Sequence, residues 1–328
     1  MDKGYKVIGV DNNFRKFLFG DDGNTNWVKK KLLEYKNYIH INSDIRNFKK
    51  IEKIFRKYNK NIDVVIHAAA QPSHDWAKKM PFVDFNINAC GTLNVLDNFK
   101  KYSNKGKFIF LSTNKVYGDR PNYIKLKELK FRYNYSDKSF NKGIDESMSI
   151  DQSTHSLFGV SKTYADLIVQ EYGKNFNLNT VCFRAGCITG PNHSGAKLHG
   201  FLSYLVKSCV KDKKYQVIGY KGKQVRDNIH SYDLINAFWE YIKKPKKGVV
   251  YNIGGGLNSN CSILEAIKFV ENFLKIKIKI KIIKQNRVGD HICYISNLNK
   301  FKKHYPKWKQ NYNFKKIMKE LIYNEINS

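Results

Sequence analysis

Short apolar runs alternate with amphipathic stretches along the chain as far as Arg184. This alternation is typical of β-α units that feed a parallel sheet, because each apolar run suits a buried strand and each amphipathic stretch suits a helix that covers it. The sequence therefore predicts an α/β fold. The predicted strands are Tyr5–Val10, Tyr38–Asn42, Asp63–Ala69, Lys107–Ser112 and Thr180–Arg184, and the predicted helices are Asn47–Tyr58, Phe82–Tyr102 and Leu157–Phe176.

Two stretches depart from this rhythm. Residues Asp119–Gly143 are polar and aromatic without a clean period, which predicts an insertion or loop. Beyond Arg184 the chain turns to short strands and glycine-rich turns, and four isoleucines alternate with lysines over 276–282. A period of two predicts a strand with one apolar face and a lysine face that keeps a sheet edge soluble. We therefore expect a first domain over 1–183 and a smaller second domain over 184–328, packed against the first.

Composition narrows the class of protein. The 328 residues are 42% hydrophobic, which is enough for proper cores and excludes a disordered or collagen-like chain. Lysine and arginine outnumber acidic residues by 59 to 28, but only eight are arginines, and the lysines are scattered along the chain. A nucleic-acid surface favours clustered arginine with interleaved aromatics. We therefore predict no nucleic-acid partner; salt-sensitive retention on RNA would reverse that prediction.

Cysteine usage and hydropathy indicate the compartment. The six cysteines form no C-x-x-C pair and no cluster with histidine, so neither a metal site nor a disulfide framework is predicted. No run approaches the ~18 apolar residues of a membrane span, and the start of the chain has no signal-peptide pattern. The sequence predicts a cytoplasmic protein with thiol cysteines and no membrane partner.

Candidate ligand-binding residues follow several predicted strands. Asp11 and Asn12 come directly after the first strand, where a dinucleotide-binding fold holds the adenosine ribose through an acidic side chain. Ala68, Ala69 and Ala70 come at and after the end of the third, where small residues let a ligand approach the backbone. Tight packing of a helix on the sheet explains the alanines equally well.

Four further motifs complete a recognisable pattern. They are Asn88-Ala89-Cys90-Gly91-Thr92, Ser112-Thr113-Asn114-Lys115-Val116-Tyr117-Gly118, Phe158-Gly159-Val160-Ser161-Lys162, and Arg184 followed by Gly190-Pro191. In this order the chain resembles the extended short-chain dehydrogenase/reductases, the NAD-dependent sugar-nucleotide epimerases and dehydratases, over essentially its whole length. Two more motifs, 222–227 and 251–256, are most similar to the branch that contains the CDP-paratose 2-epimerases.

The resemblance implies a fold, an activity and ligands. The fold is a doubly wound, Rossmann-like parallel sheet with a smaller substrate domain. The activity is epimerisation of a nucleotide sugar by transient hydride transfer to NAD, in a homodimer that supplies polysaccharide precursors. The implied cofactor-binding positions are Asp11, Asn12, Asp44, Ile45, Ala68, Ala69, Ala70, Asn88, Lys162 and Gly186. The implied substrate-binding positions are Thr113, Asn192, Arg226 and Arg287.

The chain has the catalytic residues that the resemblance implies, except for the base. The resemblance implies that Thr113 bridges base and substrate by its hydroxyl, and that Lys162 is the cation that lowers the pKa of the base. The family base is a tyrosine four residues before the lysine, where this chain has Phe158. Tyr164 follows Lys162 on the wrong face of the helix. We therefore hypothesise that Lys162 itself or His155 handles the proton.

Phe158 keeps alternatives open. A sugar-nucleotide binder without catalytic activity fits a chain that lacks the tyrosine. A related dehydratase or reductase is the other enzyme interpretation. Dehydratases of this superfamily carry acidic residues directly after the Thr113 position, and this chain has Asn114 and Lys115 there.

The first unit of a dinucleotide fold is expected to be missing. Such a fold opens with a strand, a glycine-rich turn and a helix whose N-terminus binds the pyrophosphate. No G-x-x-G-x-x-G precedes Asp11. We therefore expect a sheet that lacks its first strand, from a recorded start about 25 to 35 residues downstream of the true one or from a truncated product. The second explanation predicts little NAD binding.

Overall fold

Four parallel strands form the central sheet, in the order β11-β7-β4-β3. Their bounds are Val249–Ile253, Asn179–Ala185, Lys107–Thr113 and Val64–His67. The computed structural model describes residues 1, 3–196, 199–212, 214–286 and 289–327. β4 and β7 are apolar on both faces because helices cover both sides, as a parallel sheet requires. The fold is α/β, as predicted, although β3 ends at His67 and not at Ala69.

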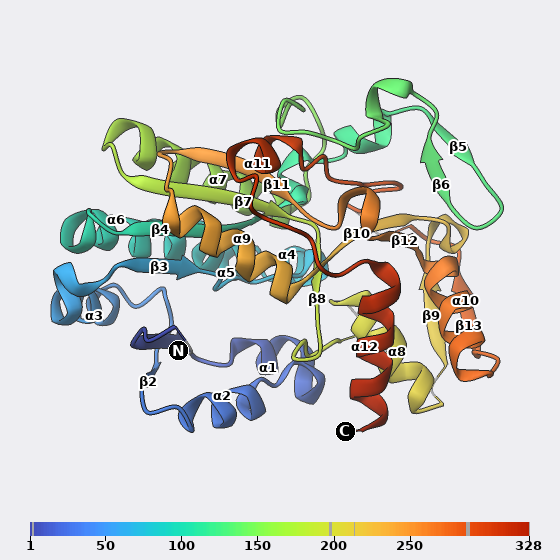
Figure 1. Ribbon diagram of the computed structural model, residues 1–328, viewed down its shortest axis with the longest axis horizontal. Helices are drawn as coiled ribbons and strands as arrows, with labels where there is room; N and C mark the ends of the chain where they lie inside the picture. The colour runs from blue at the N-terminus through green and yellow to red at the C-terminus, as the bar shows by residue number, and fades with distance from the viewer. Residues whose placement is uncertain (2, 197–198, 213, 287–288, 328) are drawn as a thin grey trace.

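A separate pair of parallel strands lies beside this sheet. β1 (Val7–Asp11) pairs with β2 (Tyr38–Asn42), and within the described residues neither pairs with β3. Figure 1 shows the dark-blue pair on the far side of β3 from β4. The order β2-β1, then β3-β4-β7, is that of a doubly wound sheet without the strand that normally separates the two groups. This arrangement agrees with the expectation of an absent first strand.

Helices hold the two groups of strands together. α3 (Phe48–Tyr58), α6 (Gly91–Ser103) and α7 (Leu157–Asn175) share one hydrophobic core with β4 and β7. Val10 of β1 and Val65 of β3 both pack against that core. The predicted helices are confirmed, and the one predicted over 82–102 divides into α5 (Pro81–Phe85), a π-helical turn (Asn86–Cys90) and α6.

The remaining sheet elements lie toward the C-terminal half. β10 (Val225–His230) pairs with β8 (Cys187–Thr189) and β12 (Asn260–Ser262), and β9 (Tyr215–Ile218) pairs with β13 (Ile280–Ile283). A second core joins β9 to three helices, α8 (Phe201–Val210), α10 (Ile263–Leu274) and α12 (Phe314–Ile326). The other helices are α1 (Phe14–Phe19), α2 (Asn26–Leu33), α4 (His74–Lys79), α9 (Ser231–Lys243) and α11 (Asn299–His304).

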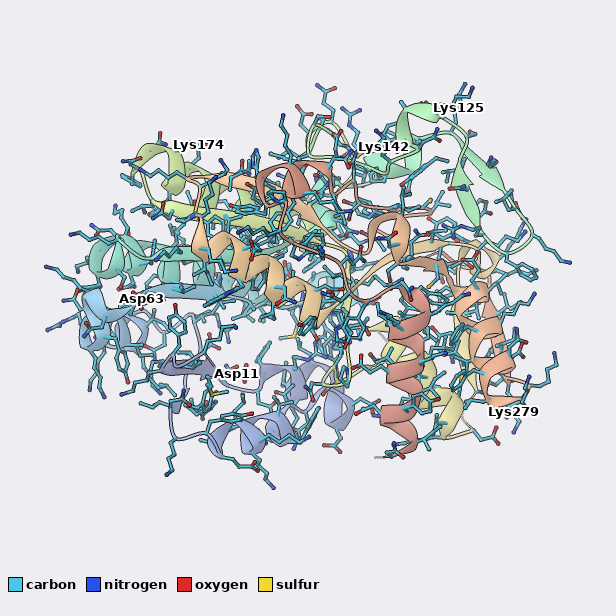
Figure 2. All side chains as sticks on the ribbon, in the orientation of Figure 1. Asp11, Asp63, Lys125, Lys142, Lys174 and Lys279 are labelled. Atoms are coloured by element: carbon cyan, nitrogen blue, oxygen red, sulfur yellow. The ribbon has the colours of Figure 1, made fainter. Side chains whose placement is uncertain are left out.

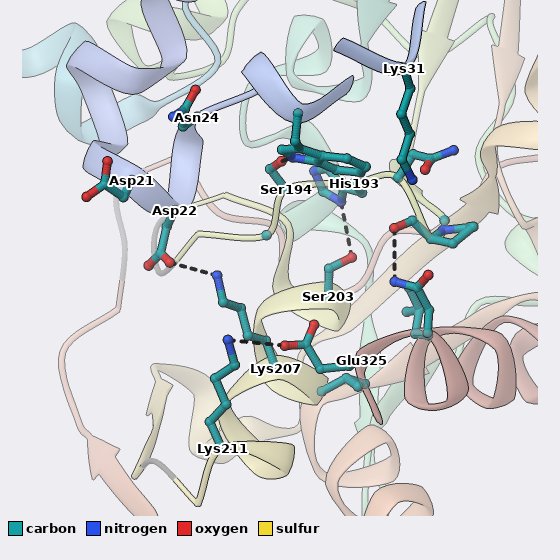
Figure 3. Close-up of a pocket in the computed structure, with 18 residues that line it drawn as sticks. Asp21, Asp22, Asn24, Lys31, His193, Ser194, Ser203, Lys207, Lys211 and Glu325 are labelled. Carbon is teal, nitrogen blue, oxygen red and sulfur yellow. Dashed lines mark hydrogen bonds and ion pairs between the residues drawn. The ribbon is translucent and has the colours of Figure 1, made fainter. Parts of the chain in front are cut away.

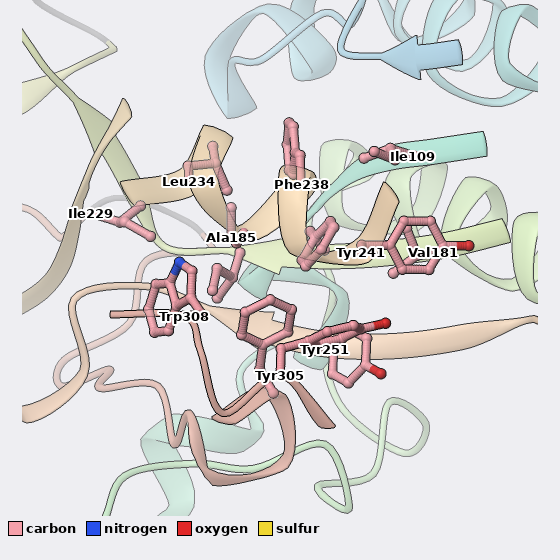
Figure 4. Packing of buried hydrophobic residues seen from close by; sticks show 14 of the residues in the cluster. Ile109, Val181, Ala185, Ile229, Leu234, Phe238, Tyr241, Tyr251, Tyr305 and Trp308 are labelled. Atoms are coloured by element: carbon pink, nitrogen blue, oxygen red, sulfur yellow. The ribbon is translucent and has the colours of Figure 1, made fainter. Parts of the chain in front are cut away.

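The predicted domain division at 183/184 stays a prediction, and the central sheet crosses it. β11 lies beyond residue 184 and pairs with β7 over five residues. Aromatic side chains from both sides of that point form one core, in which Phe183 contacts Phe238, Tyr251 and Phe301. Figure 4 shows Phe238, Tyr251 and Tyr305 of this core. The second part of the chain is therefore packed firmly on the first.

The strand predicted over 276–282 is largely wrong. The chain leaves α10 through Lys275 in the left-handed conformation, and regular pairing begins only at Ile280, opposite Tyr215 of β9. Ile276 and Ile280 are each 39% exposed and Ile282 is 59% exposed, so the alternation does not produce a buried face. Regular pairing covers only the four residues opposite β9, and Ile278 packs against the second core without belonging to a strand.

The predicted insertion contains a short hairpin. β5 (Leu126–Glu128) and β6 (Tyr133–Tyr135) pair antiparallel within it.

All six cysteines are free thiols. Among the described residues, no helix is long and apolar enough to cross a membrane, and no group of three or more histidine, cysteine or acidic side chains could hold a metal ion.

Candidate active site

The helix α7 brings Lys162 beneath the end of β4. Ser156 caps the helix by accepting a hydrogen bond from the Gly159 amide, which fixes where its first turn begins. Lys162 is only 3% exposed; its Nζ donates to the Leu111 carbonyl at 3.0 Å and lies 4.1 Å from the centre of the Phe110 ring. Burial lowers the pKa of Lys162 to about 8, against the opposing effect of Asp166. A desolvated lysine was part of our hypothesis for the proton.

Thr113 ends β4, two residues beyond the carbonyl that Lys162 binds. Its hydroxyl oxygen accepts a hydrogen bond from the Lys115 amide at 3.2 Å. That bond uses a lone pair of the oxygen, so the O–H remains able to donate. The structure thus places the two predicted catalytic residues at the same strand end.

Phe158 packs against a histidine that the sequence analysis did not single out. The rings of Phe158 and His74 are 5.0 Å apart, edge to face, and His74 Nδ1 lies 2.6 Å from Ser156 Oγ. The two nearby tyrosines do not replace the missing phenol. Tyr117 is buried and donates to Asn252, whereas Tyr164 is 37% exposed beside Phe85.

His155 is engaged by backbone carbonyls on both sides of its ring. Nδ1 lies 3.1 Å from the Ser153 carbonyl oxygen, and Nε2 lies 2.8 Å from that of Val116. A carbonyl oxygen can only accept and a neutral imidazole has one N–H, so one nitrogen donates while the other also faces a carbonyl oxygen, and neither nitrogen points to open space. This geometry argues against His155 as the group that takes a proton from substrate, although its sequence position suggested it.

The predicted adenosine-binding residues gather at the carboxyl ends of β1 and β2. Asp11 is exposed at the end of β1 (Figure 2). Asn12 donates to the Asp44 carboxylate at 3.0 Å, and Arg46 donates to both oxygens of that carboxylate at 2.9 and 2.7 Å. The Arg46 hydrogen bond is the main reason that the pKa of Asp44 is lowered. The carboxylate oxygens of Asp11 and Asp44 can accept from ribose hydroxyls or an adenine amine.

The end of β3 offers an open surface. Ala68 and Ala69 are exposed and Ala70 is half-buried. Asn88, which is 1% exposed, fixes the following segment by exchanging hydrogen bonds with the backbone of Gln71 at 2.9 and 3.0 Å. The buried Ile45 packs in the core beside Gly91. Asn88 and Ile45 therefore shape the surface from below, and the alanines form it.

Gly186 serves an internal carboxylate. A β-carbon at Gly186 would lie 2.6 Å from the Asp227 carbonyl oxygen, and one at Gly254 would overlap the Asp227 carboxylate. That carboxylate accepts from the Gly256 amide at 2.7 Å and from the Ser296 amide at 3.1 Å. The glycines thus allow three chain segments to close around Asp227.

Two cations, Arg226 and Lys115, contact the same carboxylate, that of Asp290. Arg226 of β10 is paired with Asp290 at 2.5 Å and also donates to the His291 carbonyl at 2.7 Å. Lys115, which the sequence analysis did not single out, donates to the Gly289 carbonyl at 3.0 Å and lies 3.7 Å from Asp290. Arg287 lies outside the described residues. Arg226 and Lys115 form a cationic group suited to a diphosphate.

Asn192 is exposed on the rim of a different cavity. This cavity of about 420 Å³ lies between α2, the loop 190–195, α8 and the end of α12 (Figure 3). Its wall includes the indole of Trp27, which donates to Ser194, and ion pairs of Lys207 with Asp22 and Lys211 with Glu325. Thr113, Lys162 and Arg226 do not line it. The structure therefore separates Asn192 from the other predicted substrate-binding residues.

A buried ion pair supports the site one helical turn along α7 from Lys162. Arg184 donates to both Asp166 oxygens at 2.8 and 3.2 Å and to the Tyr117 hydroxyl at 3.1 Å, and both charged side chains are at most 5% exposed. Asp166 also accepts from Ser112 at 2.5 Å. This network joins α7 to β4 and β7, so it holds Lys162 and Thr113 in register.

The fold and the site define a doubly wound α/β protein with a lysine–hydroxyl pair at the end of a central strand. A family model described as "NAD dependent epimerase/dehydratase family" matches residues 1–254. The chain belongs to this family.

Individual relatives are similar over most of their length. The CDP-paratose 2-epimerase of Salmonella typhi is 32% identical over 306 residues, which are 92% of this chain and 86% of the relative. The UDP-glucose 4-epimerase of Mycoplasma genitalium is 26% identical, covering 81% of this chain and 75% of the relative. The crystal structure of UDP-glucose 4-epimerase from Bifidobacterium longum, in complex with NAD+ and UDP, superposes with a TM-score of 0.76 at 26% identity. It covers 99% of this chain and 92% of that one.

Proposed function

We propose that this protein is an NAD-dependent epimerase that inverts a carbon of a nucleotide sugar, with a substrate like that of the CDP-paratose 2-epimerases. The observation that carries the proposal is the geometry at the end of β4, where the buried Lys162 of α7 donates to the Leu111 carbonyl, two residues before Thr113 on the strand. The 32% identity with CDP-paratose 2-epimerase supports the choice of sugar nucleotide.

The described residues fit part of the cofactor. Asp11 and Asp44 fit the adenosine end, the exposed backbone at Ala68 and Ala69 permits close approach, and Lys162 lies beneath the end that would hold nicotinamide. NAD would supply a reversible acceptor for the hydride of a sugar carbon. The glycine-rich turn that usually receives the pyrophosphate is not found among the described residues. NAD affinity is therefore a separate measurement from substrate affinity.

The residues of the chain have distinct tasks in this proposal. Thr113 accepts the proton of the reacting sugar hydroxyl on its oxygen while its own O–H donates to the base, so the proton is relayed. Lys162 stabilises the negative charge that develops on that oxygen, because a buried ammonium acts through a low dielectric. Arg226 and Lys115 hold the diphosphate, which fixes the sugar relative to Thr113.

Turnover of a defined sugar nucleotide tests the proposal. Purified protein is incubated with NAD and CDP-paratose, and the ratio of CDP-paratose to CDP-tyvelose is followed by NMR. We expect approach to an equilibrium mixture that depends on added NAD. Binding of CDP-paratose without conversion at any NAD concentration would contradict the enzyme proposal.

Arg226 provides a binding prediction. An Arg226→Gln variant is expected to bind CDP about 10- to 100-fold more weakly, because it loses charge-assisted hydrogen bonds to the diphosphate. Isothermal titration with CDP and with cytidine measures the effect. Cytidine lacks the diphosphate, so its affinity should change by less than about twofold. Equal losses for both ligands would show that Arg226 acts only by supporting the loop at Asp290.

A non-catalytic nucleotide-sugar binder is the second candidate, and Phe158 is the observation that favours it. Phe158 fills the position of the family tyrosine without an exchangeable proton. The turnover experiment separates the two candidates, because a binder shows CDP affinity without interconversion. The predicted homodimer and the division into two domains remain predictions.

A further inference from the structure

His74 contacts Phe158, the residue at the position of the family's catalytic tyrosine. It is the first residue of α4, and its ring meets the edge of Phe158, one helical turn before Lys162 on α7. Phe158 is 7% exposed, whereas His74 is half-buried. The histidine is thus the more accessible of the two rings, on the side of Phe158 that faces away from the core.

His74 also contacts the loop that carries the diphosphate-binding group. A β-carbon at Gly289 would lie 2.8 Å from His74 Nδ1, so the ring rests against the backbone there. The carbonyl of Gly289 accepts from Lys115, and the next residue, Asp290, pairs with Arg226. A substrate held by these cations would therefore extend its sugar toward the region between His74 and Thr113.

Ser156, the N-terminal cap of α7, orients one ring nitrogen of His74. Ser156 Oγ accepts from the Gly159 amide at 3.1 Å and lies 2.6 Å from His74 Nδ1. A hydroxyl oxygen has two lone pairs, so Ser156 can accept from Nδ1–H as well as from Gly159. In that tautomer the basic lone pair is on Nε2, as in sites where a second group fixes the orientation of a catalytic histidine.

We propose that His74 is the catalytic base that replaces the family tyrosine, taking the proton of the reacting sugar hydroxyl on Nε2 directly or through Thr113. This inference rests on the proposed epimerase function. The O–H bond breaks with its proton going to His74, while the hydrogen on the same carbon leaves as hydride to oxidised NAD. The reverse transfer to the other face of the keto-sugar returns both.

The test combines a loss with a rescue. His74→Gln is expected to lower kcat about 10²- to 10⁴-fold and to flatten the acidic limb of the kcat/KM pH profile. Its affinity for CDP should stay within about twofold of the parent, because the glutamine amide can still contact Ser156. Adding Phe158→Tyr should restore at least about tenfold of the lost rate, since a phenol then lies one turn from Lys162. His304→Gln, on the distant helix α11, is the matched control.

The outcomes distinguish failure of the role proposed for His74 from failure of the proposed epimerase function. Retained kcat in His74→Gln, or a parallel loss of CDP affinity and melting temperature, would overturn the role of His74 and leave the epimerase function standing. If the parent is inactive and the Phe158→Tyr variant is active, the role of His74 is overturned, while the proposed substrate and cofactor are supported. If both proteins bind CDP and neither converts the sugar, the proposed function fails and the inference fails with it.

Discussion

A Lys162→Met variant is expected to lose about 10²- to 10⁴-fold in kcat and to change the pH dependence of stability. The loss follows from removal of the buried cation beneath the reacting hydroxyl. Stability changes because the pKa of Lys162 is lowered to about 8 in the folded protein from 10.5, mainly by burial. The folded state therefore bears the cost of the buried charge at neutral pH, when the lysine of the unfolded chain is charged in water.

The sign of this linkage can be tested directly. As pH rises through about 8, the folded protein loses the Lys162 proton before the unfolded chain does near 10.5, so the parent gains stability. The difference in unfolding free energy between parent and Lys162→Met should therefore shift toward the parent by about 3 kcal/mol between pH 7 and pH 10.5.

Urea denaturation of both proteins across that range measures the shift. Lys174→Met, also on α7 but with a side chain 55% exposed, is the control and should follow the parent at every pH. Parallel curves for the parent and Lys162→Met would show that the ammonium is solvated in solution. Unchanged kcat would remove Lys162 from the mechanism.

An Arg184→Met variant is expected to unfold with a free energy about 3 to 5 kcal/mol lower than the parent, because it leaves the Asp166 carboxylate buried without its cation. Both side chains are at most 5% exposed, so water cannot replace the lost partner. The Tyr117 hydroxyl loses a partner as well. The loss should exceed that from any exposed pair in the molecule.

Two companions separate charge burial from lost packing. Arg184→Met combined with Asp166→Leu should recover a large part of the loss, because removal of both charges leaves no uncompensated ion. Lys101→Met breaks the exposed pair with Glu52, whose charged atoms are 2.9 Å apart, and should lower the unfolding free energy far less than Arg184→Met. Denaturant titrations at pH 7 compare all three. A single variant as stable as the Lys101→Met control would contradict a structural role for the buried pair.

The parts of the fold that depend on local pattern could be predicted from the sequence. The strand at Tyr38–Asn42 has the predicted bounds, and α7 begins at the predicted Leu157. Hydrophobic period and a capping serine specify such elements within a few residues of sequence. The prediction for the isoleucine–lysine stretch failed because its partner strand, β9, lies about 60 residues earlier in the chain, where a local pattern cannot reveal it.

The site was only partly predictable for a similar reason. Resemblance to a family located Thr113 and Lys162, which the structure brings to one strand end. It could not locate His74, because His74 belongs to none of the motifs that carry the resemblance. His74 meets Ser156 across 82 positions of the chain and Gly289 across a still longer separation. His155 was favoured by nearness in sequence, yet two carbonyls occupy its ring. Nearness along the chain is a weak guide to which imidazole faces a substrate.

The closure around Asp227 bears on how this sequence can change over time. A run of three glycines, such as Gly254 to Gly256, commonly suggests a phosphate-binding loop. Here Gly254 and Gly186 make room for a carboxylate of the same chain. Gly254 cannot acquire a side chain while the Asp227 carboxylate is present, and Asp227 cannot shrink without leaving a void between three segments. Gly186 meets first the backbone carbonyl of residue 227, so it is held as glycine whatever side chain stands there. Positions 227 and 254 are therefore constrained to evolve together, as one heritable unit.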